Sequence, residues 1–329
     1  MTKTNRNSTF YDCLKAKDKH GYEIEIFWLS GILLIIVGVL GLIGNAINFT
    51  ILCQAQLRKE VFYNLLLSLT CFDTIFILSY GINMSYKSIA CSPQDITFED
   101  ITFPFYQIGI LGSLYMTVAI SLERFLGICH PVLRLRRNVW FYLVPVFLVV
   151  IVFTLPIFAE SKFFFINGTL TSSAKGIWSN DSDEATWKRV VYMFVYTIIP
   201  VFSLLVLNGL IIRELQKTPD VLRTVGPSRR KLKATKILLW IVIIFFILNM
   251  PRLAFKGLLY LAPEEKKNWY WVRPGVRLAL VANSSLNFWI YLINGDRFRK
   301  QFLKIFNLRN FELQEKRSPS AISNLESRF

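Results

Sequence analysis

The chain alternates between long apolar stretches and short polar segments. A helix that crosses a bilayer needs about 20 mostly apolar residues. Helix is the expected conformation, because backbone groups in lipid must satisfy their own hydrogen bonds and the short alternating strands of a membrane β-barrel are missing. The second, third and seventh stretches carry more polar residues than the others. The predicted membrane-spanning helices are Ile26–Cys53, Val61–Ser85, Ile101–Cys129, Asn138–Phe158, Val190–Ile212, Ile237–Leu261 and Val276–Ile293.

A further amphipathic pattern follows the seventh stretch, between Asp296 and Asn307. Basic residues fill one helical face, and the other face is apolar, with Phe298, Phe302, Leu303 and Phe306. This pattern is typical of a helix lying in the membrane surface. The sequence therefore predicts an all-α membrane fold, a seven-transmembrane helix bundle with a cytoplasmic amphipathic eighth helix. Its segments are an extracellular tail (1–25), the bundle (26–293), the eighth helix (294–307) and a cytoplasmic tail (308–329).

Composition agrees with a membrane protein and argues against other classes. Hydrophobic residues make up 53% of the 329 residues, and the bases behind the net charge of +16 lie beside the apolar runs. A nucleic-acid-binding protein would gather its bases on one soluble face, so no nucleic acid partner is expected. His20 and His130 are the only histidines, and no metal-ligand cluster is visible. Because phosphate loops and nucleophile–base motifs are also missing, we do not expect an enzyme.

Lys and Arg residues set the expected orientation. They concentrate in the segment Arg213–Lys236 and after the seventh span, whereas acids offset the bases on the opposite side. Since basic loops stay in the cytoplasm, the C-terminus is predicted to be cytoplasmic and the N-terminus extracellular, in the plasma membrane. The N-terminal tail conflicts locally with this rule, because it has more bases than the first short loop. The tail contains no signal-peptide pattern, so the first span is expected to act as the insertion signal.

Three glycosylation triplets lie on the predicted outer side of the membrane. They begin at Asn7, Asn167 and Asn180. Such triplets are common by chance, but their shared side agrees with the orientation and predicts a glycoprotein. Triplets at Asn48 and Asn283 lie inside predicted spans, where we expect them to stay unmodified.

Polar residues at similar depth in several spans predict a buried polar site. Asp73 is the only acid deep in a predicted span, and ionisable residues at such depth are costly and usually functional. It could hold a cation or waters, or the polar residues could only join helices by hydrogen bonds. The other members are Asn45, Ser113, Asn283, Ser284 and Asn287.

The cytoplasmic end of the third span carries Glu123-Arg124. The arginine could simply anchor the helix at the membrane interface. Pro200 and Pro251 lie inside the fifth and sixth spans, where each removes a backbone hydrogen bond and should kink its helix. Kinked helices can pivot, which suits a two-state switch.

Taken in order, these residues resemble the rhodopsin-like receptor family from Phe27 to Phe306. Each motif is weak alone, but their order on seven spans is specific. Within the family, the chain most resembles invertebrate FMRFamide-type peptide receptors, through Val118–Phe125, Cys129–Pro131, Val206–Asn208 and Asn283–Phe288. The family motifs are Gly44-Asn45, Leu69 to Asp73 with the sodium-binding aspartate, Glu123-Arg124-Phe125, Pro200, Pro251, and Asn287 to Tyr291 in place of Asn-Pro-x-x-Tyr.

Several positions depart from the family pattern. Asn249 stands where many members have a toggle tryptophan, and Lys231 replaces the acidic partner of the third-helix arginine. Glu99 replaces the third-helix cysteine, and the fourth span lacks a central tryptophan. The second outer loop, 160–189, has no cysteine, so the standard extracellular disulfide cannot form. Cys13 and Cys91 could pair instead on the oxidising side, or could remain free thiols.

The resemblance implies a receptor that couples an extracellular ligand to a heterotrimeric G protein. It implies an outward pivot of the sixth helix near Pro251, which exposes Arg124 to the G protein. The remaining switch residues would be Glu123, Asn208, Asn287 and Tyr291, and a sodium ion would bind at Asp73, Ser113, Asn283, Ser284 and Asn287. Bases at 229–233 would face anionic membrane lipid and the partner, or would only fix topology.

Two positions in the sequence narrow the class of ligand that this receptor could bind. Val281 stands where opsins carry the retinal-binding lysine, and Tyr106 where amine receptors carry an aspartate, so light and amine receptors are disfavoured and a peptide site remains. An amidated Arg-Phe peptide needs an acidic partner for its arginine. Glu99, Asp100 and Glu160 are candidates, or they are ordinary solvated loop acids. The pocket is also expected to include Asn249 and the bases Arg252, Lys256 and Arg277, which would suit a carboxylate-bearing ligand.

Two rival interpretations stay open. A transporter would show internal repeats and charges spread over several spans, and neither pattern is visible. A seven-helix descendant that no longer signals is consistent with Asn249, the altered arginine partner and the missing disulfide. The same losses could instead give a constitutively active receptor.

Overall fold

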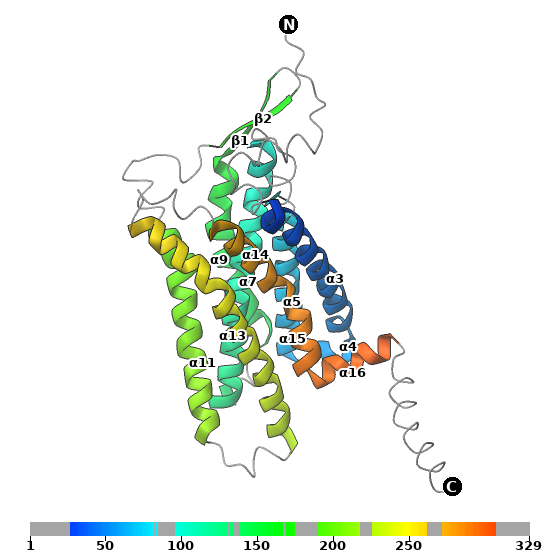
Figure 1. Ribbon diagram of the computed structural model, residues 1–329. Helices are drawn as coiled ribbons and strands as arrows, with labels where there is room; N and C mark the ends of the chain where they lie inside the picture. The colour runs from blue at the N-terminus through cyan, green and yellow to red at the C-terminus, as the bar shows by residue number, and fades with distance from the viewer. Residues whose placement is uncertain are drawn as a thin grey trace, which may run out of the picture.

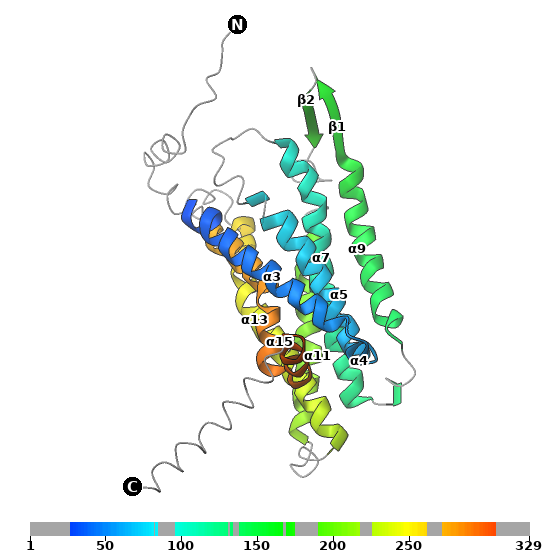
Figure 2. The ribbon, with the colours of Figure 1, turned by 90° about the vertical axis from the view of Figure 1, so that its right-hand side faces the viewer.

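The computed structural model describes residues 27–81, 83–84, 96–130, 132–133, 138–166, 169–174, 190–217, 226–261 and 272–306. Within these ranges the chain forms an elongated helix bundle (Figures 1 and 2). The first helices are η1 (Phe27–Leu33), α3 (Leu34–Leu52), α4 (Ala55–Arg58), α5 (Val61–Phe76) and η2 (Ile77–Gly81). Next come α7 (Ile96–Cys129), α9 (Trp140–Glu160), η3 (Phe194–Ile198), α11 (Ile199–Lys217) and α13 (Gly226–Leu261). The last are α14 (Val272–Ser285), α15 (Asn287–Asn294) and α16 (Asp296–Ile305).

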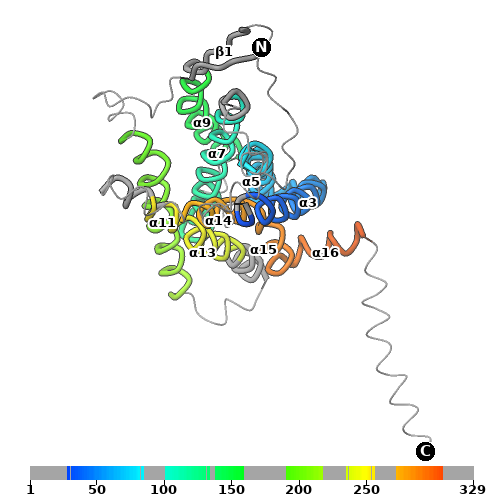
Figure 3. The backbone as a smooth tube through the Cα atoms, turned by 45° about the horizontal axis from the view of Figure 1, so that its top comes forward, coloured from blue at the N-terminus to red at the C-terminus, as the bar shows by residue number. Residues whose placement is uncertain are grey.

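Helix α7 forms the centre of the bundle, in contact with α5, α9, α11 and α13. Helix α3 packs on α5 and α14. Figure 3 shows α3 and α11 on opposite sides, with α7, α13 and α14 between them. The helices between residues 31 and 294 thus pack around one shared interior.

The exposure pattern is the reverse of that in a soluble bundle. Large apolar side chains point outward, among them Leu148, Leu155, Phe202 and Ile247, which are 56%, 62%, 66% and 64% exposed. The polar side chain of Asp73 is fully buried. An apolar outer surface this extensive suits contact with lipid, so the prediction of a membrane bundle is confirmed.

Five described helices are long and apolar enough to cross a bilayer: Gly31–Leu52, Val61–Gly81, Ile101–Cys129, Trp140–Phe158 and Val190–Lys217. The predicted sixth span lies within α13, whose apolar stretch Ile237–Arg252 is shorter. The predicted seventh span is bent by 43° between α14 and α15. The bend follows the pair Ser284-Ser285, a sequence type at which helices commonly kink.

The two prolines that were predicted to kink their helices occupy different positions in the helices of the structure. Pro200 is the second residue of α11, two residues after the end of the π-helical turn η3. A proline lacks the N–H that an α-helical turn would use, so a wider turn before it is a natural consequence. Pro251 lies inside α13, where it removes one bond from the helix backbone.

An antiparallel hairpin follows α9, which the all-α prediction did not include. Strand β1 (Ser161–Ile166) pairs with β2 (Thr169–Ala174), with Ser161 opposite Ala174 and Ile166 opposite Thr169. Figure 2 shows β1 continuing upward from the end of α9. The sequence between the strands is Asn167-Gly168, a strong hairpin signal that a search for apolar spans overlooks.

Helix α16 lies across the lower end of the bundle (Figure 1). Its one buried apolar residue is Phe298, 1% exposed, whose ring lies 5.7 Å from that of Tyr291 and 6.3 Å from that of Phe288. Arg297 forms an ion pair with Glu60, which precedes α5. The ring of Phe302 also lies 6.0 Å from that of Phe288, and the Gln301 amide donates to Oε1 of Gln56 at 2.6 Å. The helix is therefore held to the bundle by aromatic contacts, an ion pair and a hydrogen bond.

Candidate functional site: a polar core beneath a small cavity

Asp73 lies at the centre of a hydrogen-bonded group drawn from three helices. The Ser113 hydroxyl on α7 donates to Oδ1 at 2.7 Å, and the Asn287 amide on α15 donates to Oδ2 at 2.6 Å. The Ser284 hydroxyl is a third hydrogen-bond neighbour of the carboxylate. A carboxylate without water around it needs such donors, so these contacts join α5, α7 and the seventh span at one point.

Two of the predicted members sit further from the carboxylate. Asn45 on α3 is 1% exposed, and its amide lies 3.5 Å from the carbonyl oxygen of Ser284. Asn283 is half-buried and lines the cavity above Asp73. The carboxylate and the two serine hydroxyls are oxygen ligands, the type that hard cations prefer. The residues therefore fit a sodium ion, which remains a prediction.

Several buried polar atoms have no protein hydrogen-bond partner within the described residues. They include Oδ1 of Asn45, both amide atoms of Asn48, Oδ1 of Asn208 and the Tyr291 hydroxyl. Buried polar groups of this kind are normally satisfied by ordered water. The interior near Asp73 is thus suited to hold water as well as an ion. Asn48 was not among the residues predicted for this site, although an asparagine within a span is the same kind of signal as Asn45.

Glu123 and Arg124 form a buried charged pair on α7. Their side chains are 1% and 7% exposed, and Nε of Arg124 lies 2.6 Å from Oε2 of Glu123. The guanidinium also lies 3.8 Å from the ring centroid of Phe62 on α5, a cation–π contact. A snorkelling anchor would keep its charged group in water, so this burial argues for a specific role. Phe62 was not among the predicted residues, because no sequence signal marks a cation–π partner.

Asn208 links α11 to α7. Its amide donates to the Ser121 hydroxyl at 3.3 Å and to the Leu204 carbonyl at 2.8 Å. Ser121 lies three residues before Arg124, so the link is one helical turn from the charged pair. Tyr291 is 1% exposed and packs on Phe298. Five of the predicted switch residues therefore lie in the interior, namely Glu123, Arg124, Asn208, Asn287 and Tyr291, whereas Pro251 is exposed. Asn208 and Tyr291 do not contact one another in any hydrogen bond of the described residues.

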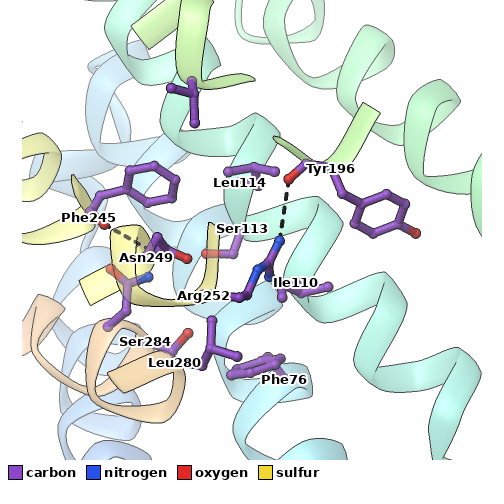
Figure 4. A pocket seen from close by; sticks show the side chains of 12 residues that line it. Phe76, Ile110, Ser113, Leu114, Tyr196, Phe245, Asn249, Arg252, Leu280 and Ser284 are labelled. Atoms are coloured by element: carbon purple, nitrogen blue, oxygen red, sulfur yellow. Dashed lines mark hydrogen bonds between the residues drawn. The ribbon is translucent and has the colours of Figure 1, made fainter. Parts of the chain in front are cut away.

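A cavity of about 20 Å³ opens directly above the Asp73 group, which is room for a water-sized guest. Figure 4 shows Ser113, Ser284, Asn249 and Arg252 around it, with Phe76 and Leu280 forming apolar walls. Asn249 donates to the Phe245 carbonyl at 2.9 Å, a bond within its own helix. Ser113 and Ser284 line the cavity and also contact Asp73. The cavity floor and the polar core therefore share side chains.

The remaining predicted pocket residues fall into two groups. Tyr106 on α7 packs edge-on against Tyr80, with ring centroids 5.3 Å apart, and Arg277 on α14 lies within hydrogen-bonding reach of the Tyr80 hydroxyl. Tyr80 itself was missed, because tyrosine at a helix end gives no distinctive sequence signal. The backbones of Glu99, Asp100 and Glu160 lie in α7 and α9, and their side chains are outside the described part of the structure, as is that of Lys231.

Other predictions concern positions outside the described residues: the Cys13–Cys91 disulfide and glycosylation at Asn7, Asn167 and Asn180. Within the described residues, Cys53, Cys71 and Cys129 are free thiols.

Comparison with known proteins places this chain in a family. A family model described as "7 transmembrane receptor (rhodopsin family)" matches residues 44–291. The crystal structure of squid rhodopsin superposes with a TM-score of 0.68 at 15% identity, covering 87% of this chain and 86% of that one. The chain therefore belongs to the rhodopsin family of seven-transmembrane receptors and is an integral membrane protein. Its family and fold are those of receptors and not of enzymes.

Particular relatives give a finer view. The FMRFamide receptor of Drosophila melanogaster is 29% identical over 307 residues, which cover 85% of this chain and 54% of that receptor. The chain thus spans about half the length of that relative. Human C-C chemokine receptor type 1 is 24% identical over 83% of this chain and 78% of its own length. Human lysophosphatidic acid receptor 6 is 28% identical over 68% and 66%.

Proposed function

We propose that this receptor transmits the binding of an extracellular peptide, of FMRFamide-like class, to a heterotrimeric G protein. The N-terminus would face outward and the C-terminus the cytoplasm of the plasma membrane. The ligand class is supported by the relationship to the Drosophila FMRFamide receptor and by the residues shared with that subfamily. The observation that carries the mechanism is that Ser113 and Ser284 belong to both the cavity and the Asp73 group.

Because Ser113 and Ser284 line the cavity and also contact Asp73, a ligand in the cavity can change the hydrogen bonds of the polar core directly. A group that enters the cavity would contact Ser113 or Ser284 and compete for the hydroxyls that stabilise Asp73. A ligand can shift a conformational equilibrium only by its differential affinity for the two states. The Asp73 contacts join α5, α7 and α15, so their rearrangement changes how three helices pack. A sodium ion bound at Asp73 would favour the resting arrangement.

The same rearrangement would reach the cytoplasmic end through α13. Pro251 weakens the α13 backbone beside the cavity, and an outward pivot there would open the bundle below it. Arg124 is held by Glu123 and Phe62 in the structure. Opening would release its guanidinium toward the G protein. The cost of separating this buried pair gives the resting state its stability.

The test is a signalling measurement in cells with a promiscuous G protein. Intracellular calcium would be recorded against a library of short peptides, each in amidated and free-acid form. We expect a response in the wild-type receptor that Arg124→Ala abolishes. Lys300→Ala, which removes an exposed positive charge from α16, should leave the response unchanged.

The other outcomes separate the alternatives. Signal without peptide that Arg124→Ala removes would indicate a constitutively active receptor. Silence from receptor shown to be at the cell surface would count against the peptide proposal. It would favour a carboxylate-bearing small molecule or a descendant that no longer signals.

A further inference from the structure

Arg252 is a buried cation with incomplete partners. It follows Pro251 on α13, is 8% exposed, and lines the cavity in Figure 4. Its Nη2 donates to the Tyr196 carbonyl at 3.4 Å, a long contact, and its Nε has no hydrogen-bond partner within the described residues. A guanidinium removed from water is costly unless an anion or several acceptors complement it. The site is therefore incomplete as it stands.

No carboxylate within the described lining supplies that complement. The residues around the cavity include no aspartate or glutamate. The acid of the polar core is Asp73, whose two oxygens already accept from Ser113 and Asn287. The positive charge of Arg252 is thus left for a group that enters from outside the polar core.

Among the described residues, the side chains around Arg252 are phenols and a second cation, with no anion. Its electrostatic neighbours are Tyr80, Tyr106 and Tyr196. A second guanidinium, that of Arg277 on α14, lies within reach of the Tyr80 hydroxyl. Two cations and neighbouring phenols from different helices form a site of positive potential, which suits an anionic group.

We infer that Arg252, supported by Arg277 and Tyr80, binds a carboxylate of the ligand. The source would be the free C-terminus or an acidic side chain of a peptide, so this inference rests on the proposed function. A planar carboxylate can accept from the guanidinium nitrogens of one arginine side by side. A neutral C-terminal amide would leave the charge of Arg252 uncompensated, so a peptide amidated at its C-terminus would have to supply the carboxylate from an acidic side chain.

The test measures binding to purified full-length receptor without any G protein. The thermal unfolding midpoint in detergent would be followed during titration with N-acetylphenylalanine, which carries a carboxylate, and with its amide. We expect the acid to raise the midpoint at lower concentration than the amide. Arg252→Gln should weaken the apparent affinity for the acid by about tenfold or more. Arg273→Gln is the matched control, because Arg273 lies on α14 over the ring of Phe255 and not in the cavity lining.

Each contrary result has a definite meaning. Equal stabilisation of wild-type receptor by acid and amide would overturn the inference, and so would an acid preference that persists in Arg252→Gln. Should Arg252→Gln not fold, Arg252→Lys keeps the charge but loses the paired donors, and it must still weaken acid binding. Inorganic phosphate is a third probe, and stronger stabilisation by phosphate through Arg252 would replace the carboxylate with a phosphate-bearing ligand. A receptor that binds the acid but never signals would refute the proposed function and leave this inference standing.

Discussion

The close approach of α5 and α7 at Gly109 gives the sharpest prediction. A methyl group at this position would lie 2.6 Å from the backbone nitrogen of Phe76 and 2.7 Å from its Cα. Non-bonded atoms normally approach to about 3.5–4.0 Å, so the helices must separate by about 1 Å. Backbone atoms cannot rotate away, so Gly109→Ala should carry about 3 kcal/mol of strain, the upper end for overpacking. The better helix propensity of alanine returns about 1 kcal/mol, for a net loss of about 2 kcal/mol.

The matched control is Gly209→Ala on α11, where nothing lies within 4 Å of the added methyl group. This variant should gain about 1 kcal/mol from propensity alone. The two variants then differ by about 3 kcal/mol, or about 6–12 °C in unfolding midpoint. The midpoint would be read from the monodisperse fraction that remains after heating in detergent. If Gly109→Ala unfolds at the same temperature as Gly209→Ala or above it, the close packing of these helices is refuted.

Three further predictions concern the polar core and its supports. Asp73→Asn should remove any stabilisation of the purified receptor by sodium over potassium chloride at equal ionic strength, and a sodium effect that survives would place the ion elsewhere. Phe298→Ala should cost about 3 kcal/mol because the ring is fully buried, whereas Phe306→Ala, at an exposed ring, should leave the unfolding midpoint almost unchanged. Asn208→Ala leaves Ser121 without its interhelical donor and should cost about 1 kcal/mol, and it should also alter the calcium response; an unchanged midpoint would mean that the α7–α11 link is not stabilising.

The bundle could be predicted because the bilayer limits the choices. An apolar stretch of sufficient length must be helical in lipid, so the stretches found by inspection correspond to helices of the structure. The predictions failed where a local feature, such as a turn sequence or a serine pair, changed the backbone in a way that span length does not reveal. The hairpin Ser161–Ala174 was missed because it lies outside the apolar spans. The bend near Leu286 was missed because the family proline is absent and a serine pair precedes the break.

The candidate site was predictable in its members but not in its contacts. Asp73, Ser113 and Asn287 were found by depth and motif, and the structure brings them within hydrogen-bonding distance. Depth alone could not place Asn283 beside the cavity instead of the carboxylate. Which of the two sites Asn283 faces depends on how the seventh span is rotated about its own axis, and that rotation follows from the packing of all neighbouring helices.

The sequence by itself determined that this chain spans a membrane and which residue types are buried within it, because hydration costs act on each segment separately. Only the tertiary structure decided which polar groups satisfy one another. Asp73 obtains donors from two other helices, whereas Arg252 has one long bond, to the Tyr196 carbonyl, within the part of the chain that the structure describes. Both are ionisable residues within apolar stretches, and the sequence around them does not indicate that one obtains several hydrogen-bond partners and the other does not. The physical reason is that a hydrogen bond depends on the mutual position of two segments far apart in the chain, and that position is fixed by close packing.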